Sequence, residues 1–584
     1  MAGSLLILSS EWSAESDRAL CHFAEFLGVK VDFVSASEAV SRLSPGLQCV
    51  AMNIETAKNL LSQPSFEEVQ RGAGCLFVYG FDAADQEHTG LKRLTGNAVK
   101  SVAAIQSGKK EFSIHATATS ADSPVAGKSY SVESVAPVSV FSGSSTDSRV
   151  ENIISVNGQP HFLSVSSGGA KIFLLAARSL FDIEKPVGRN FSQRNHYAEW
   201  CALSILLRSI FGADCWTAPN RFATVTIDDP SLQKRYGFVE YETLLPEIKK
   251  LGCALTIAFI PYNHRRSDPK IVDLARRHQR QFSITVHGCD HTGGEFASCD
   301  ERWLNGITNC ALERMDSHFR RTQMPYDDVM IFPQGRFSTK AVAVLKQCRY
   351  VATVNSSPWA ADVTDGALTA RAMLDVAVTS YSSFPFFVRR YPLDAFEFAF
   401  DALFQKPLFV VEHHEYFRNG YGPLARFVGQ LDAIGTTKPT WVPLREAVTS
   451  SCVMRPTGES QYQVRFFTPV FKLRNPTDRR CSFSLMKPET TDSVTEVVWG
   501  KRSIPFEVKS GHLRCEVEAA PGQEQELKVV YREVPKNPHR PSIKYRSKVF
   551  VRRLLSDARD NYLSRSSFLL AAARKAKKIA RRRS

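Results

Sequence analysis

The chain has 584 residues, of which 43% are hydrophobic and 23% charged, and it carries a net charge of +15. This composition is typical of a soluble globular protein of several domains, and no apolar run is long enough to span a bilayer. The thirteen cysteines form no C-x-x-C pair, which favours reduced, buried thiols over a disulfide framework. The first residues lack the basic start of a secretory signal, so we expect a cytoplasmic protein.

Residues 1–215 are expected to form an N-terminal α/β domain of the flavodoxin-like type. Apolar runs with helical patterns between them predict strands over 5–8, 30–36, 48–53 and 74–81. Strand–helix alternation at this spacing favours a parallel sheet. From about residue 95 to 180, alternating runs rich in Ser, Thr and Val predict added β structure on the same domain. No glycine-rich phosphate loop follows the first strand, so no nucleotide site is predicted.

Residues 216–448 return to strand–helix alternation. The predicted strands lie in the segments FATVTI, CALTIAFI, FSITVHG, DVMIFP, YVATVN and PLFVVEHH. Six or more such units predict a (β/α) barrel or a large doubly wound sheet. Residues 449–535 instead contain short alternating strands with few helical patterns, which indicate a β-sandwich. Residues 536–584 are expected to form a linker and a basic amphipathic tail.

Polar side chains follow the ends of the strands predicted over 216–448. They are Asp228 and Asp229 after the first strand, His287 and His291 after the third, Arg336 after the fourth, and His413 and His414 after the last. In a parallel barrel the carboxyl ends of the strands converge on one face, which is where catalytic sites are built. The order along the chain therefore predicts that these groups are neighbours.

A carboxylate and two imidazoles with one coordination position left open are a usual set for a catalytic divalent metal, with Zn²⁺ the first candidate. Adjacent Asp residues are usually a solvated turn, and a His pair four residues apart is more often coincidence, so only the combination carries the prediction. Asp228 and Asp229 can then divide the work, one holding the metal and the other accepting a proton from water. A distant histidine can protonate the leaving group.

With these motifs, residues 220–448 resemble the polysaccharide deacetylase family, metal-dependent esterases that remove N- or O-acetyl groups from sugars. TIDDP is similar to the family's T-F-D-D-G motif, HGCDH to its H-[ST]-x-x-H motif, and LFVVEHH to its last motif. The resemblance implies a deformed (β/α) barrel. It also implies that Asp228 is the catalytic base and that the metal ligands are Asp229, His287 and His291.

The resemblance further implies a catalytic-acid histidine, either His413 or His414. Period-two alternation places these two on opposite faces of their strand, so only one is expected to point into the site. Arg336 in FPQGRFS loosely matches the family's arginine–proline motif, which orients the base, although it follows the proline. Gly288 replaces the family's Ser or Thr, and Trp359 is all that matches the D-x-x-D-W motif.

The C-terminal segment holds almost all of the net charge, because residues 541–584 contain fourteen Lys or Arg and two Asp. Its apolar side chains recur at helical spacing at Phe550, Val551, Leu554, Leu555, Ala558 and Tyr562, and Phe568, Leu569 and Leu570 follow. An amphipathic helix with a basic polar face can lie on an anionic membrane. A disordered, solvated tail is the alternative. Nucleic acid is a disfavoured partner, because no aromatic–basic binding module accompanies the charge.

These features together predict a cytoplasmic deacetylase held at the inner face of a membrane. Its substrate would be an acetylated sugar of a bacterial-type surface glycan or of its lipid-linked precursor. Another metal-dependent hydrolase on the same barrel, a glycosidase or an amidase, is one alternative. A non-catalytic glycan-binding protein is the other: the missing acidic residues near Trp359 favour it, whereas the intact metal-ligand set favours retained metal binding.

Overall fold

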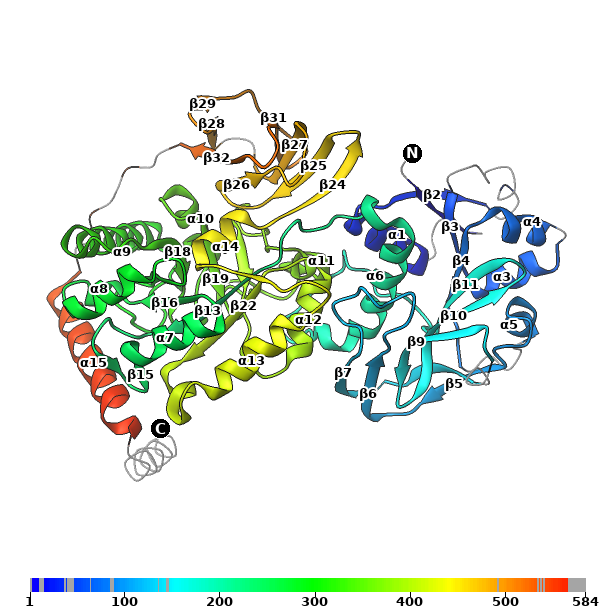
Figure 1. Cartoon of the computed structure of the whole chain (residues 1–584), viewed down its shortest axis with the longest axis horizontal. Coiled ribbons are helices and arrows are strands. Elements are labelled where there is room, and N and C mark those ends of the chain that lie inside the picture. Colours follow the sequence, from blue (N-terminus) through cyan, green and yellow to red (C-terminus); the bar gives the residue numbers. More distant parts are fainter. Residues whose placement is uncertain are drawn as a thin grey trace.

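The structure is a computed structural model that describes residues 3–9, 15–35, 38, 47–63, 65–83, 89–134, 136–142, 147–490, 493–532, 535, 538 and 541–565. It contains an N-terminal α/β part, a central barrel, a β-sandwich and a C-terminal helix (Figure 1). The apolar residues predicted at 568–570, the basic cluster that follows them and most of the predicted linker lie outside the described residues.

The N-terminal part is built on one nine-stranded sheet with the order β2-β1-β3-β4-β11-β10-β9-β6-β7. Its first five strands are parallel: β2 (Lys30–Val34), β1 (Ser4–Leu8), β3 (Leu47–Asn53), β4 (Cys75–Tyr79) and β11 (Ala170–Leu175). The other four continue the sheet antiparallel: β10 (Gln159–Ser167), β9 (Val150–Val156), β6 (Gly108–Ile114) and β7 (Lys128–Ser134). Most of the Ser- and Val-rich region thus extends the α/β sheet, while β5 (Ser101–Ile105) and β8 (Val138–Ser142) pair with each other as a separate two-stranded sheet.

The central part is a nearly closed barrel of parallel strands. In spatial order these are β21 (Phe386–Val388), β19 (Ala352–Asn355), β18 (Asp327–Ile331), β17 (Phe282–His287), β16 (Leu255–Phe259), β13 (Phe222–Asp228) and β22 (Leu408–His413). The two ends of this sheet meet where Arg390 pairs in parallel with Val410. The backbone N–H of Arg390 donates to Phe409 O at 2.8 Å, and that of Val411 donates to Arg390 O at 2.9 Å. Every residue of β13, β16 and β17 is buried, as expected for strands covered on both faces.

Helices surround the barrel, and four of them are capped by a side chain at the first turn. They include α7 (Tyr241–Leu251), α8 (Pro269–Arg277), α9 (Glu301–Thr322), α10 (Thr339–Gln347), α12 (Ala395–Leu403), α13 (Gly422–Asp432) and α14 (Leu444–Ser450). Asp268, Asp300, Ser338 and Asp394 each precede one of these helices and accept a hydrogen bond from its free backbone N–H groups. These caps fix where α8, α9, α10 and α12 begin, and so help to fix the loops that precede these four helices.

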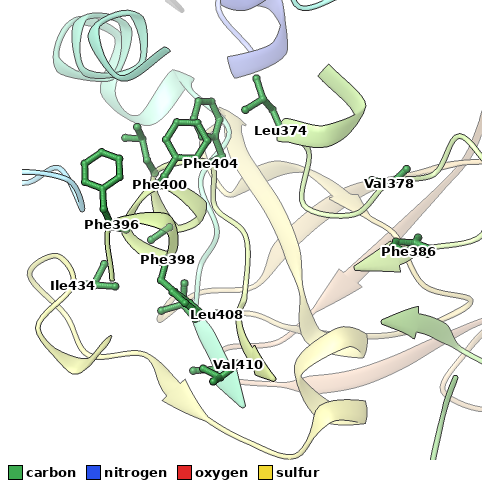
Figure 2. Close-up of a cluster of buried hydrophobic side chains, with 14 of the residues drawn as sticks. Leu374, Val378, Phe386, Phe396, Phe398, Phe400, Phe404, Leu408, Val410 and Ile434 are labelled. Atoms are coloured by element: carbon green, nitrogen blue, oxygen red, sulfur yellow. The ribbon is translucent and has the colours of Figure 1, made fainter. Parts of the chain in front are cut away.

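Aromatic packing joins the N-terminal part to the barrel. Figure 2 shows Phe396 and Phe400 of α12, together with Phe404 directly after it, projecting on one side and Phe398 on the other. Phe400 stacks on Tyr197 of α6 (Tyr197–Phe211) with ring centroids 3.8 Å apart. Phe404 packs edge-on against Phe23 of α1 (Glu15–Leu27), at 6.2 Å between centroids. One hydrophobic cluster therefore runs from the N-terminal helices into the barrel wall.

The β-sandwich consists of a five-stranded and a four-stranded sheet. The first has the order β24 (Cys452–Gly458), β25 (Gln461–Phe466), β27 (Cys481–Pro488), β31 (His512–Ala519) and β30 (Glu507–Lys509). The second has the order β26 (Val470–Arg474), β32 (Glu524–Tyr531), β28 (Val494–Trp499) and β29 (Arg502–Ser503). Alternate residues of β27 and β31 are buried, which is the pattern of strands with one face on a core. Buried Glu489 pairs with Lys346 of α10 and so ties the sandwich to the barrel.

The C-terminal helix α15 (Ile543–Asn561) lies along the barrel, where Figure 1 shows it in red beside α8. Asp557 accepts an ion-paired hydrogen bond from Arg266 at 2.8 Å. The apolar side chains predicted to face a membrane are the exposed ones, with Phe550 60% and Leu555 64% accessible. Among the described residues, no helix combines the length and the apolar composition that crossing a bilayer would need.

Candidate metal centre and catalytic cavity

A cavity of about 560 Å³ opens at the carboxyl ends of the barrel strands. Its walls include six of the seven residues proposed from the sequence: Asp228, Asp229, His287, His291, His413 and His414. They come from the ends of β13, β17 and β22 and from the loop after β17, which a parallel barrel brings to the same face.

Asp228 is the last residue of β13 and is buried against a cation. Its two carboxylate oxygens accept hydrogen bonds from the two terminal nitrogens of Arg389, at 2.7 and 2.5 Å. Arg389 also donates to Thr226 at 3.1 Å, so its guanidinium is fixed on the inner face of β13. Burial opposes ionisation of Asp228, but Arg389, His287 and His413 outweigh it and hold the pKa below its usual value. The Asp228 carboxylate is therefore ionised at neutral pH.

Asp229 turns away from Asp228 because its backbone is left-handed, with φ of 83°. Its Oδ1 atom lies 3.0 Å from Nε2 of His291 and 3.5 Å from Nε2 of His287. That oxygen is buried and accepts no aligned hydrogen bond from any residue the structure describes. Left-handed backbone at a non-glycine residue is costly and tends to occur at functional sites. The two adjacent carboxylates therefore contact different groups: Asp228 contacts Arg389, and Asp229 contacts the two histidines.

The three side chains Asp229, His287 and His291 form the metal-type cluster of the described residues, with one ligand atom from each lying within 4.8 Å of the others. Nδ1 of His287 lies 3.1 Å from Ile331 O, which fixes the tautomer that leaves Nε2 free for a cation. The buried Oδ1 of Asp229 faces both Nε2 atoms from the other side. Burial opposes ionisation of Asp229, but its two histidine neighbours hold the pKa well below its usual value. The donor set fits a divalent cation with a further position open.

The loop that carries the two histidines is held by Glu295. Its buried carboxylate accepts hydrogen bonds from the backbone N–H groups of Cys289, Asp290, His291 and Thr292, at 2.9, 3.3, 3.2 and 3.0 Å. The same loop requires glycine at position 288. Its φ is +61°, and a Cβ there would lie 2.3 Å from side-chain atoms of both Glu295 and Pro333. A Ser or Thr does not fit that space, which explains the departure from the family motif.

Both His413 and His414 line the cavity, so lining by itself does not choose between them. β22 ends at His413, and His414 begins the 3-10 helix η5 (His414–Asn419), where strand alternation no longer applies. His413 is opposite Asp228 in the strand register and stacks on Tyr391 with centroids 6.3 Å apart. His414 is buried, with its ring against Gly237.

Arg336 was expected to orient the proposed base Asp228, but it does not contact that residue. It follows a turn in which Gln334 has φ of 57°, and it lines a neighbouring cavity instead of contacting Asp228. Arg389, which directly follows β21, provides the cation that pairs with Asp228. The sequence signal for Arg389 was an arginine pair after the short run FFV, but β21 is only three residues long and was not predicted.

The helix α15 closes one side of the cavity, which the sequence did not indicate. Its residues Arg552, Ser556, Arg559 and Asp560 line the cavity wall. Arg552 donates from Nε to His291 O at 3.0 Å, on the loop after β17. Gly237, on the loop after β13, donates its backbone N–H to Asn561 Oδ1 at 2.9 Å. The helix therefore bridges the two loops that frame the metal-type cluster.

Asp560 is the polar centre of this contact. Its carboxylate accepts from Tyr236 at 2.7 Å and from Arg559 at 2.5 Å, and lies 3.6 Å from Nε2 of His414. Burial opposes its ionisation, but His414, Arg559 and Tyr236 outweigh it and lower the pKa of Asp560 to about 2. Its stabilising contribution is thus present above the ordinary pKa of 3.8 and is lost as the pH falls towards 2.

No family model and no curated protein matches the chain. Among solved structures, Agd3, described as a novel carbohydrate deacetylase, aligns over 91% of this chain and 99% of its own, at 9% identity and a TM-score of 0.45. A family 4 carbohydrate esterase from Streptomyces lividans aligns over 38% of this chain and 98% of its own, at 12% identity and 0.23. A family 4 pseudoenzyme from Bacillus anthracis aligns over 38% and 65%, at 11% and 0.25. Similarity at this level assigns neither family nor activity, which must come from the site itself.

We expect Asp560→Ala to loosen α15 at pH 7. The change leaves the buried hydroxyl of Tyr236 without its acceptor, which costs about 1–3 kcal/mol for a buried polar group. Amide hydrogen exchange of α15 measures the loss as faster exchange along the helix. Leu554→Ala on the same helix is the matched control, because Leu554 is 57% exposed and should change little. Equal exchange in the two variants would contradict the docking role of Asp560.

Proposed function

We propose that the protein is a metal-dependent deacetylase that removes N- or O-acetyl groups from a sugar. The observation that carries the proposal is the pair of adjacent carboxylates with separate partners: Asp229 beside His287 and His291, and Asp228 beside Arg389. Metal-dependent hydrolysis of an amide or ester requires a metal centre and, beside it, an ionised carboxylate that is not itself a metal ligand. We further propose Zn²⁺ as the metal, on the chemistry of one carboxylate and two imidazoles.

A divalent cation held by Asp229, His287 and His291 would supply Lewis-acid polarisation of the acetyl carbonyl and of an attacking water. The residues around it do the rest. Asp228, kept ionised by Arg389, accepts the proton of the water that attacks the carbonyl carbon. The C–N or C–O bond of the acetyl group then breaks, acetate leaves, and the sugar amine or hydroxyl takes a proton from a histidine on the opposite wall.

We assign that proton donor to His413. Its half-buried ring has no hydrogen-bond partner among the described residues, and it lies at the strand position opposite Asp228. His414 is buried with Nε2 towards Asp560, so its ring is committed to holding α15 in place. The two neighbouring histidines therefore have different work, one chemical and one positional.

The alternative hydrolases differ from this proposal in what they require. A retaining glycosidase needs a second carboxyl group about 5–5.5 Å from the acid, free to attack the sugar carbon. Both oxygens of Asp228 accept from Arg389, and the other carboxylate of the pair, Asp229, faces the two histidines, so neither stands apart as a second, free carboxyl group. A non-catalytic glycan-binding protein would not need an ionised carboxylate beside a metal-type cluster. We therefore rank both alternatives below deacetylation.

We also propose that the substrate belongs to a surface glycan or its lipid-linked precursor and that the C-terminal segment contacts an anionic membrane from the cytoplasmic side. The outer face of α15 supports this, because Phe550, Val551, Leu554 and Leu555 are all more than half exposed there. Basic residues surround that face and continue to the end of the sequence. Apolar insertion and attraction to anionic lipid add together in such a segment.

The purified protein should contain about one Zn²⁺ per chain and should release acetate from acetylated hexosamine oligosaccharides. The Asp229→Ala, His287→Ala double variant should lose both, measured by elemental analysis and by an acetate assay. Asp228→Asn keeps the ligands, so it should retain the metal and lose acetate release by about 10²–10⁴-fold. Metal without acetate release in the wild type would refute deacetylation, and no metal in either protein would refute the catalytic centre.

Substitutions of His413 and His414 should have different effects. His413→Ala should lower kcat by about 10²-fold or more while α15 remains protected from hydrogen exchange, because only the proton donor is lost. His414→Ala should instead increase exchange in α15. The reverse pattern would transfer the acid role to His414.

Membrane contact can be measured by sedimentation with vesicles of phosphatidylglycerol or of phosphatidylcholine. We expect binding to the anionic vesicles only, weakened by salt and by Leu554→Glu with Leu555→Glu. Leu393→Glu is the control, since Leu393 is 88% exposed but lies on the barrel before α12. Equal binding to both lipids, or none, would refute the contact.

A further inference from the structure

Arginines at the mouth of the barrel fall into two groups. Arg389, Arg559 and Arg314 are each paired with an aspartate. Arg189, Arg336 and Arg552 have no carboxylate within ion-pair distance among the residues that the structure describes. Their charges are therefore not used to hold the fold through ion pairs, and they remain available to a ligand.

Two of these three arginines line a second cavity that adjoins the first. This cavity of about 490 Å³ is lined by Arg189, Gly335, Arg336, Ser357, Trp359 and Ala361. Gly335 and Ser357 also line the cavity of the metal-type cluster, so the two spaces share a wall. No Asp or Glu is among the described residues that line the second cavity. A ligand that begins at the metal centre and extends along Gly335 enters a space whose charged groups are all positive.

The side chains around this path are held in place. Arg189 donates from one terminal nitrogen to Ala360 O and, at 3.0 Å, to Val363 O. Arg552 donates from Nε to His291 O at 3.0 Å, and its two terminal nitrogens make no hydrogen bond to a residue that the structure describes. Both guanidiniums lie close to the same stretch of backbone. A Cβ on Gly293 would lie 3.6 Å from Arg552 and one on Gly294 would lie 3.7 Å from Arg336, which are ordinary contact distances.

Trp359 adds an aromatic surface to the same cavity. It is half-buried, and part of it packs on the hydrophobic core while the rest lines the space beside Arg336. Aromatic rings with one side anchored offer a rigid apolar face at small entropic cost. A sugar ring has such an apolar face, and its carboxylate, where it has one, is the group that an arginine binds best.

We propose that the second cavity binds a uronic acid, so that the substrate is an acidic glycan in which an acetylated sugar adjoins a sugar carboxylate. The acetylated sugar lies at the metal-type cluster, and the neighbouring uronate lies on Trp359 with its carboxylate between Arg189 and Arg336. Arg552 lies on the other side of the glycine pair and extends the positive surface towards the metal centre. This inference rests on the proposed deacetylation for the place of the acetyl group, but the binding of the carboxylate can be measured without it.

The test compares two hexasaccharides on the full chain carrying Asp228→Asn, so that neither is consumed. One is heparosan, in which glucuronate alternates with N-acetylglucosamine, and the other is neutral chitohexaose, which contains N-acetylglucosamine alone. Calorimetric titration should show heparosan binding about tenfold or more tightly at low salt, the gain expected from charge-assisted hydrogen bonds. The preference should decrease in 0.5 M NaCl, where the Debye length is short and the attraction between exposed charges is screened.

Arg189→Gln combined with Arg336→Gln should abolish the preference while leaving chitohexaose binding unchanged. Arg320→Gln is the matched control, since Arg320 is exposed on α9 and has no ion pair in the described structure. Trp359→Ala should weaken both probes to a similar extent, because stacking does not depend on the carboxylate. Thermal unfolding midpoints equal to that of the parent verify that the variants fold.

Equal affinity for the two probes would overturn the proposal. So would a heparosan preference that survives in the double arginine variant, because the carboxylate would then be bound elsewhere. A preference that the double variant abolishes, in a wild-type protein that releases no acetate from either probe, would support the uronate site and refute the deacetylase activity. The two proposals can therefore fail separately.

Discussion

The buried ion pair between Asp228 and Arg389 organises the functional end of this molecule. A carboxylate at the end of a fully buried strand is stable as an ion only if a cation meets it there. Arg389 can do so because the next residue, Arg390, pairs with Val410 and joins the last strand of the sheet to β22. Closing the barrel and ionising Asp228 are thus achieved by two adjacent residues. The same closure places β22 beside β13 and so brings His413 opposite Asp228.

The metal-type cluster depends on a second buried carboxylate. Glu295 uses both oxygens to collect four consecutive backbone N–H groups of the loop after β17. Charge-assisted bonds of this kind are about twice as strong as neutral ones. They hold His291 in its left-handed conformation, where its ring meets Asp229 and His287. Gly288 is part of the same device, since any side chain there would displace the Glu295 carboxylate.

Much of this site could be predicted from the sequence because strand ends mark it. Asp229, His287 and His291 follow long, strongly apolar strands, and parallel strands in one barrel leave those ends little choice of position. Local reasoning failed where the backbone left its regular path. Gln334 turns Arg336 away from Asp228, and alternation ended one residue before His414. Arg389 and Asp560 were missed for other reasons: one follows a strand too short to recognise, and the other reaches the site only by tertiary docking.

The position of α15 late in the sequence affects the order in which the site is assembled during synthesis. Synthesis runs from the N-terminus, so the barrel strands that carry Asp228, His287 and His413 leave the ribosome well before Arg552 and Asp560 do. A nascent chain can build the barrel while one wall of its cavity is still inside the exit tunnel. A chain clipped by a protease before residue 543 would retain every predicted metal ligand and yet have an open, unbraced cavity. A helix synthesised after the whole barrel therefore completes the site.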